Sequence, residues 1–181
     1  SGFSPKDFAI LDKYKMDYLK IPSGEITNIL LLEYIAKNSV SSRKIIMSTG
    51  MSNLEEVEQA INILKKNGVS QSNIVLLHCT TDYPAPLDSI NLKAMTTLKK
   101  QFKCEVGYSD HSAGKDISIA AVAMGATIIE KHFTLDRSMK GPDHKASLDV
   151  KGFSSMVKSL RNTHLALGSS IKEISYAEKN N

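Results

Sequence analysis

The stretch IVLLHCTTDY, residues 74–83, joins a short apolar run to a polar tip, and this combination recurs along the chain. The apolar part is too short for a helix and nearly continuous in its hydrophobicity, as in a strand that is buried on both faces of a parallel sheet. Four further runs of this kind follow one another at similar intervals: residues 18–22 (YLKIP), 44–48 (KIIMS), 104–108 (CEVGY) and 127–131 (TIIEK). The sequence therefore predicts five strands.

Helical patterns fill the intervals between these runs. Ser4 with Pro5 forms a cap and first turn, Ser52 with Glu55 forms a capping-box pattern, and Gly68 stands where a helix would end. The amphipathic or apolar stretches cover residues 5–15, 26–37, 57–66, 92–102, 117–124 and 153–167. Helices and strands alternate without a hairpin signal, which predicts a parallel α/β sheet with right-handed crossovers.

Two architectures fit this alternation: an open doubly wound sheet and a (β/α)8 barrel of the TIM-barrel type. No phosphate-binding glycine motif follows the first strand, which disfavours a nucleotide-binding sheet. Polar groups follow every strand, in the order SGE, STG, CTTDY, SDH and HFT. Such groups are typical of barrel enzymes, although open sheets also bind ligands at this edge. Five units cannot close an eight-stranded barrel, so a barrel would lack its first three strands.

Composition excludes several classes of protein. Hydrophobic residues make up 41% and charged residues 23%, an ordinary globular balance. The net charge is +4, and the Lys and Arg residues are interspersed with Asp and Glu rather than clustered. We therefore expect no nucleic acid partner, although a small anionic substrate fits. No apolar run is long enough to span a membrane, and no start resembles a signal peptide. Two cysteines without CxxC spacing fit a reduced compartment, and we expect a cytoplasmic protein.

Two histidines stand at matched positions after the last two predicted strands. His111 ends GYSDH and His132 lies in EKHFT. Because the carboxyl ends of neighbouring parallel strands lie roughly 5 Å apart, the two imidazoles could share one divalent metal ion. Two ligands would leave open positions for water and substrate, as a catalytic ion requires. Alternatively, each histidine is an ordinary hydrogen-bonded residue at a strand end.

The motif KIPSGE places Lys20, Ser23 and Glu25 at the first predicted strand. An inward-facing lysine and a serine at the strand tip suit a phosphate or carboxylate, and Glu25 could act as an acid or base. Spacing alone favours a structural ion pair between Lys20 and a neighbouring carboxylate. His78, inside an apolar run, is predicted to be a hydrogen-bonded core residue.

Two further polar residues lie in loops. Tyr83 precedes PAP, whose prolines stiffen the loop, so it could hydrogen-bond to a ligand, with packing as the alternative. Asp143, in the polar turn GPDH, could bind sugar hydroxyls or be an ordinary turn aspartate.

Taken together, KIPSGE, IIMSTGM, LLHCTTDYPAP, GYSDH, EKHFT and GPDHKAS, in this order, resemble the sialic acid synthase family. The resemblance implies a (β/α)8 barrel followed by a small antifreeze-like domain. It implies condensation of phosphoenolpyruvate with an N-acetylated hexosamine, typically N-acetylmannosamine, to give N-acetylneuraminate or a related nine-carbon acid and phosphate. It also implies a divalent metal, most commonly Mn²⁺, with Mg²⁺ or Co²⁺ as alternatives.

The resemblance assigns roles residue by residue. It implies that His111 and His132 are the metal ligands, and that Tyr83 and Asp143 contact the amino sugar. The chain would belong to a homodimer in the full-length enzyme.

Phosphoenolpyruvate contacts are implied for Lys20, Ser23 and Ser109. Glu25 resembles the carboxylate near the reacting carbon and the attacking water. Thr81 stands where some members carry an asparagine that contacts phosphoenolpyruvate, and threonine is shorter.

Family members are longer than this chain. We therefore expect residues 1–181 to be a partial barrel domain holding strands 4–8, without the amino-terminal strands and the antifreeze-like domain, and with little or no activity alone. Legionaminate or pseudaminate synthesis is an alternative to N-acetylneuraminate synthesis. Others are a non-catalytic remnant that binds metal or phosphoenolpyruvate, and a Schiff-base lyase, for which Lys20 is the better lysine and Lys131 a poor one.

Overall fold

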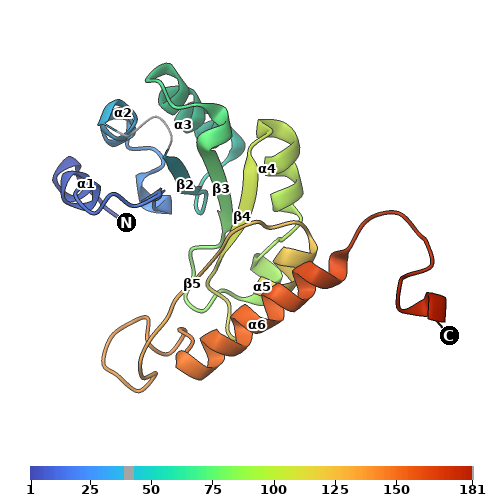
Figure 1. Ribbon diagram of the computed structural model, residues 1–181. Helices are drawn as coiled ribbons and strands as arrows, with labels where there is room; N and C mark the ends of the chain where they lie inside the picture. Colours follow the sequence, from blue (N-terminus) through green and yellow to red (C-terminus); the bar gives the residue numbers. More distant parts are fainter. Residues whose placement is uncertain (39–42, 181) are drawn as a thin grey trace.

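The computed structural model describes residues 1–38 and 43–180 and contains one five-stranded parallel sheet (Figure 1). The strands follow one another across the sheet in the order in which they occur in the chain. They are β1 (Tyr18–Ile21), β2 (Lys44–Ser48), β3 (Ile74–Cys79), β4 (Glu105–Asp110) and β5 (Ile129–Lys131). The five strands and their parallel arrangement confirm the α/β prediction.

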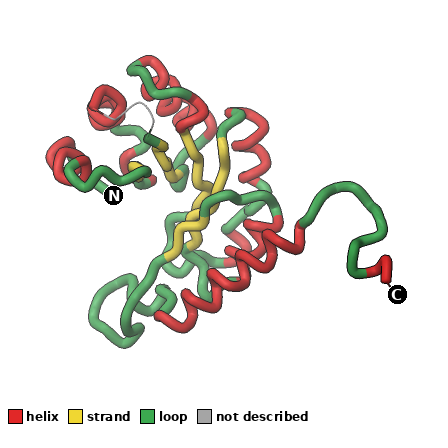
Figure 2. Tube along the Cα trace, in the orientation of Figure 1, coloured by secondary structure: helices red, strands yellow, loops and turns green. Residues whose placement is uncertain are grey.

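Helices connect the strands, and Figure 2 shows them around the outside of the sheet. The α-helices are α1 (Pro5–Asp12), α2 (Ile29–Asn38), α3 (Leu54–Lys66), α4 (Ala94–Phe102), α5 (Asp116–Ala123) and α6 (Val150–Leu167). Short 3-10 turns are η1 (Ser23–Glu25), η2 (Gln71–Asn73), η3 (Leu87–Ser89) and η4 (Glu178–Asn180). Within the described residues, no helix has the length and apolar character needed to cross a membrane.

The sheet is strongly curled, and one ion pair demonstrates it. Lys20 of β1 and Glu130 of β5 stand on the two outermost strands, yet Lys20 Nζ lies 3.7 Å from Glu130 Oε2. In a flat sheet the first and fifth strands would lie roughly 19 Å apart, too far for these side chains to meet. The fold is therefore a half-barrel rather than an open doubly wound sheet.

The two faces of the sheet differ in chemistry. One face packs against the helices and forms the main apolar core, in which Ile21, Met47 and Leu76 are fully buried. Because side chains alternate along a strand, the residues between them point to the other side, which we call the concave face. Lys20, Ser109 and Glu130 lie there, which places the polar groups inside the curl.

The predicted helix starts are correct at one position and wrong at another. Ser4 caps α1, where its Oγ accepts a hydrogen bond from the Asp7 amide. The capping box of α3, however, is formed one residue later than predicted, by Asn53 and Glu56. Ser52 instead donates its hydroxyl hydrogen bond to the Gly50 carbonyl, so it closes the preceding turn.

Two strand boundaries also differ from the prediction. β4 continues to Asp110, two residues beyond the predicted run 104–108, so Ser109 and Asp110 belong to the strand and His111 follows it directly. β5 begins only at Ile129, and just before it the Thr127 amide and hydroxyl both donate to the Val106 carbonyl of β4. The last strand is therefore only three residues long.

Candidate active site

Three aromatic rings meet at the carboxyl ends of β3, β4 and β5. The ring centroids of His111 and His132 are 5.3 Å apart, with the rings nearly perpendicular. The Tyr83 ring lies 4.3 Å from that of His111 and 5.3 Å from that of His132. The histidines that were predicted to converge do so, and Tyr83 contacts both.

Hydrogen bonding fixes the tautomer of His111. Its Nδ1 lies 2.7 Å from the Thr80 carbonyl oxygen, which can only accept, so Nδ1 carries the proton. Nε2 then keeps its lone pair, and the Ser109 hydroxyl lies 3.4 Å from it. Burial lowers the pKa of His111, the hydrogen bond to the Thr80 carbonyl opposes this shift, and the neighbouring His132 adds to it. The net lowering favours the neutral ring, which is the form that binds metals.

The separation of the two rings matches the spacing that one shared metal ion would require. With metal–nitrogen bonds of about 2.1 Å, two imidazoles on one ion have centroids roughly 4.6–5.3 Å apart, and the observed separation is 5.3 Å. The Thr80 carbonyl that orients His111 is the kind of outer partner that metal-binding histidines have. In the described part of the chain, no group of three or more His, Cys, Asp and Glu side chains is placed to hold a metal. The pair would therefore leave most coordination positions to water and substrate.

Asp143 lies beside the histidine pair. One of its carboxylate oxygens is 3.7 Å from His132 Nδ1, although the two residues come from different segments. The loop after β5 thus returns to the site, and Asp143 stands at its rim, where about half of its side chain is exposed.

Lys20 and Ser109 meet through a residue that the sequence analysis did not single out. The Ser109 hydroxyl donates to Glu130 Oε1 over 2.7 Å, and Lys20 pairs with the other carboxylate oxygen. Burial lowers the pKa of Lys20, and Glu130 opposes this shift. The ion pair between Lys20 and a carboxylate that the sequence analysis favoured is therefore present, with Glu130 as the partner. Because Glu130 also binds Ser109, the pair holds Lys20 next to Ser109. Side chains alternate between the two faces along EKHFT, which puts Glu130 on the same face as His132. This alternation could have identified Glu130 as a site residue.

Four residues from three strand ends form a second cluster. The Ser23 hydroxyl lies 3.1 Å from Cys79 Sγ and accepts a hydrogen bond from the Gly50 amide. A Cβ atom on Gly50 would lie 2.3 Å from Thr81 Oγ1. Thr81 Oγ1 is buried and has no hydrogen-bond partner among the described residues. The hydrogen-bonding capacity of this hydroxyl is thus unused in the structure.

Glu25 belongs to the η1 turn after β1. It is half-buried in η1, where Asn28 Nδ2 donates a hydrogen bond to its carboxylate over 2.7 Å. It follows Ser23 by two residues, so it lies on the same loop as the second cluster.

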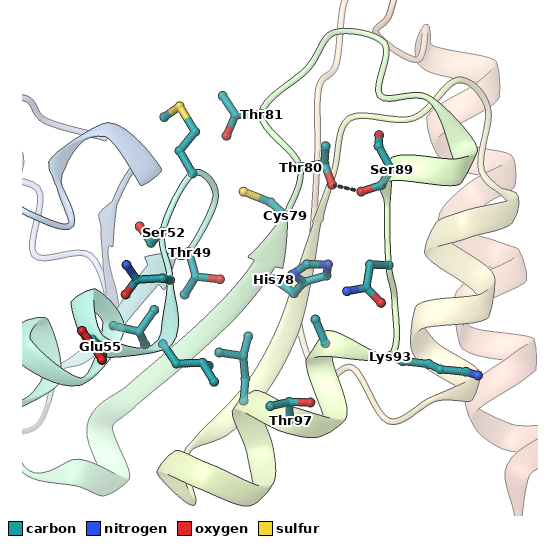
Figure 3. Close-up of a pocket in the computed structure, with 17 residues that line it drawn as sticks. Thr49, Ser52, Glu55, His78, Cys79, Thr80, Thr81, Ser89, Lys93 and Thr97 are labelled. Atoms are coloured by element: carbon teal, nitrogen blue, oxygen red, sulfur yellow. Dashed lines mark hydrogen bonds between the residues drawn. The ribbon is translucent and has the colours of Figure 1, made fainter.

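A pocket of about 1230 Å³ lies away from the histidine pair, between α3 and α4 at the end of β3, as Figure 3 shows. His78 lines this pocket, and its Nε2 donates a hydrogen bond to the Ile90 carbonyl over 2.7 Å. This agrees with the prediction that His78 is a hydrogen-bonded residue. Cys79, Thr80 and Thr81 line the pocket and also border the clusters described above. The histidine pair itself lies on the open concave face of the half-barrel.

Known proteins share both the sequence and the fold. The chain is 52% identical to the N,N'-diacetyllegionaminic acid synthase of Campylobacter jejuni, over 99% of this chain and 53% of that protein. It is 46% identical to the Legionella pneumophila enzyme of the same name, over 96% of this chain and 48% of that protein. The chain thus spans about half the length of these relatives.

A solved structure gives the same picture. The N-acetylneuraminic acid (sialic acid) synthetase of Leptospira borgpetersenii, in complex with citrate, aligns with a TM-score of 0.88 and 36% identity. The alignment covers 98% of this chain and 60% of that one. The NeuB family model matches residues 1–172. This match, together with the identities to the named relatives, shows that the chain belongs to the NeuB family of sialic-acid-type synthases.

Proposed function

We propose that this chain carries a major part of the active site of a nonulosonic acid synthase. The reaction is the condensation of phosphoenolpyruvate with an N-acetylated hexosamine, with release of phosphate. The observation that carries the proposal is the convergence of His111, His132 and Tyr83 at three neighbouring strand ends in a member of the NeuB family.

His111 and His132 would hold a divalent metal, for which Mn²⁺ is the first choice and Mg²⁺ or Co²⁺ are alternatives. When bound, such an ion supplies Lewis-acid polarisation of the sugar aldehyde oxygen. Tyr83 covers both imidazoles, so it excludes water from one side of the pair. Asp143, at the rim beside His132, accepts hydrogen bonds from sugar hydroxyls.

Phosphoenolpyruvate carries two anionic groups, and the two clusters on the concave side offer the complementary donors. Lys20 supplies a positive charge next to the Ser109 hydroxyl. Ser23 and the unpaired Thr81 hydroxyl supply neutral donors one strand end away. Holding both anions fixes the enolpyruvate carbon against the aldehyde, which is a positioning effect.

Glu25 completes the proposed chemistry. The carbon that bears phosphate becomes electron-poor after the new carbon–carbon bond forms, and water adds there. A carboxylate on the η1 loop can accept a proton from this water, after which the adduct loses phosphate. Glu25 is the carboxylate of that loop.

The relatives support a choice among the candidate sugars. The sequence motifs alone lead to N-acetylmannosamine as the expected sugar, while the 52% identity to a legionaminic acid synthase favours a 2,4-diacetamido hexose. A pseudaminic acid synthase from Campylobacter jejuni is 38% identical over 93% of this chain, which makes its substrate a weaker candidate. We propose the legionaminic type of sugar.

We also propose that the full-length enzyme is a homodimer and that it is located in the cytoplasm.

The test is phosphate release by a chimera. The Campylobacter jejuni relative supplies the segments that this chain does not span, and Mn²⁺ and phosphoenolpyruvate are present throughout. We expect release with a 2,4-diacetamido hexose that exceeds release with N-acetylmannosamine. If a folded chimera released no phosphate with any of the hexosamines, the synthase proposal would be refuted.

A further inference from the structure

The last strand has an ambiguous sequence. β5 has three residues and pairs with β4 alone, through Tyr108 with Ile129, Ser109 with Glu130 and Asp110 with Lys131. A shift of one residue would exchange the faces of all its side chains, so that Lys131 would lie on the concave face and His132 under the helices. Ile129 packs against the second apolar cluster, but Ile128 is equally apolar and residues 130–132 are all polar, so hydrophobicity alone does not choose between these registers.

A buried ion pair is formed only in the observed register. Lys131 Nζ lies 3.1 Å from Asp110 Oδ2, and the two side chains are 1% and 0% exposed. Both residues end their strands and are direct partners in the parallel ladder. Their side chains therefore point to the helix side, opposite to that of His111 and His132.

The surroundings satisfy the carboxylate completely. The amide and hydroxyl of Ser112 donate to Asp110 Oδ1 over 2.8 and 2.6 Å, and the Ser118 hydroxyl of α5 donates to Oδ2. Lys131 also donates to the Ser112 carbonyl. The network connects β4, β5 and α5 immediately behind the histidine pair.

Because the ion pair between Asp110 and Lys131 is buried, a contribution to the stability of the fold is a poor explanation for its presence. Two buried charges lose their hydration, and buried ion pairs often contribute little to stability, whereas specification of register is their best-attested use. We infer that Asp110 and Lys131 are positioning residues that hold β5 in the one register in which His132 stands beside His111. The importance of this spacing for metal binding rests on the proposed function, but the spacing itself can be measured without metal.

The test variant is Asp110→Asn. Asparagine has the same size and can still accept from Ser112, but it leaves the Lys131 ammonium without a counter-charge. We expect Lys131 to turn toward water and to displace β5. Nuclear Overhauser contacts between the His132 ring and the rings of Tyr83 and His111 should then disappear from the metal-free 181-residue chain. The affinity for Mn²⁺ should fall by about 10–100-fold, as it does when outer partners of metal ligands are lost.

A second variant separates positioning from folding. In Asp110→Asn/Lys131→Met neither position carries a charge, and the apolar methionine stays on the helix side. We expect the ring contacts and the Mn²⁺ affinity to recover. Should Asp110→Asn fail to fold, this double variant is compared directly with the wild type.

A matched control is Asp12→Asn. It removes the carboxylate from another buried cation, Arg43, whose side chain is 7% exposed, outside the site. We expect lower stability with unchanged ring contacts and Mn²⁺ affinity.

Two results would overturn the inference: ring contacts that persist in Asp110→Asn, or a folded double variant that lacks them. If the wild type binds no Mn²⁺ but its ring contacts respond as expected, the metal proposal fails and the positioning role stands.

Discussion

Replacing Gly50 with alanine should impair phosphoenolpyruvate binding more than it impairs folding. The backbone of Gly50 is not in the left-handed region, so alanine is tolerated there and only space is at issue. The new Cβ would lie 2.3 Å from Thr81 Oγ1, 2.6 Å from Cys79 Sγ and 2.9 Å from Ser23 Oγ. All three distances are too short, so these side chains must rotate away.

The magnitudes differ for stability and for binding. Inserting one carbon into packed surroundings costs about 1–3 kcal/mol of unfolding free energy. A hydrogen bond to a charged group contributes about 1.5–3 kcal/mol, so the loss of one hydroxyl donor lowers the affinity for phosphoenolpyruvate about 10–100-fold. We therefore expect a folded variant with much weaker binding.

The assay is calorimetric titration of phosphoenolpyruvate into the Mn²⁺-loaded chimera without sugar, with urea unfolding in parallel. Gly24→Ala is the matched control, because Gly24 belongs to the neighbouring η1 loop and a Cβ there would meet nothing within 4 Å. Wild-type affinity in Gly50→Ala would refute the assignment of this cluster to phosphoenolpyruvate.

Three further predictions concern single side chains. Lys20→Met should raise the KM for phosphoenolpyruvate at least about tenfold, since a charge-assisted contact is lost, and steady-state phosphate release measures this. Tyr83→Phe keeps the ring that covers the histidines, so Mn²⁺ affinity should be unchanged while the KM for the sugar rises; an unchanged sugar KM would contradict the assignment. Burial lowers the pKa of His78 below its ordinary 6.5, so the unfolded chain binds a proton before the folded one does. The free energy of unfolding should then decrease as pH falls below 6.5, and urea unfolding of His78→Gln should show a smaller decrease.

Much of the fold could be predicted because each strand has its own local signal. The run IVLLH is apolar and bounded by polar residues, and β3 indeed begins at Ile74. The curl of the sheet has no local signal in any one strand, and the barrel was expected from the polar strand ends and the family resemblance, which do not fix individual contacts across it. For this reason the contact between Lys20 and Glu130 could not be foreseen, although a carboxylate partner for Lys20 was.

The site was predictable to a similar degree. His111 and His132 could be paired from their matched positions after two strands, and the structure brings them together. The STG tip that holds Gly50 could be predicted as a polar strand end, but the crowding of Gly50 by the side chains of Ser23, Cys79 and Thr81 could not, because these side chains come from other strand ends. Lys131 was considered only as a poor candidate for covalent catalysis, since a sequence does not reveal that its charge is matched by Asp110 in a buried network.

The central claim is that His111 and His132 share one divalent ion, and direct titration with Mn²⁺ tests it. Electron paramagnetic resonance of the 181-residue chain should report one bound ion, which is lost in both His111→Ala and His132→Ala. His78→Gln, a histidine variant on the opposite face of the sheet, should bind as the wild type does. Stoichiometric Mn²⁺ binding by His111→Ala would contradict the account.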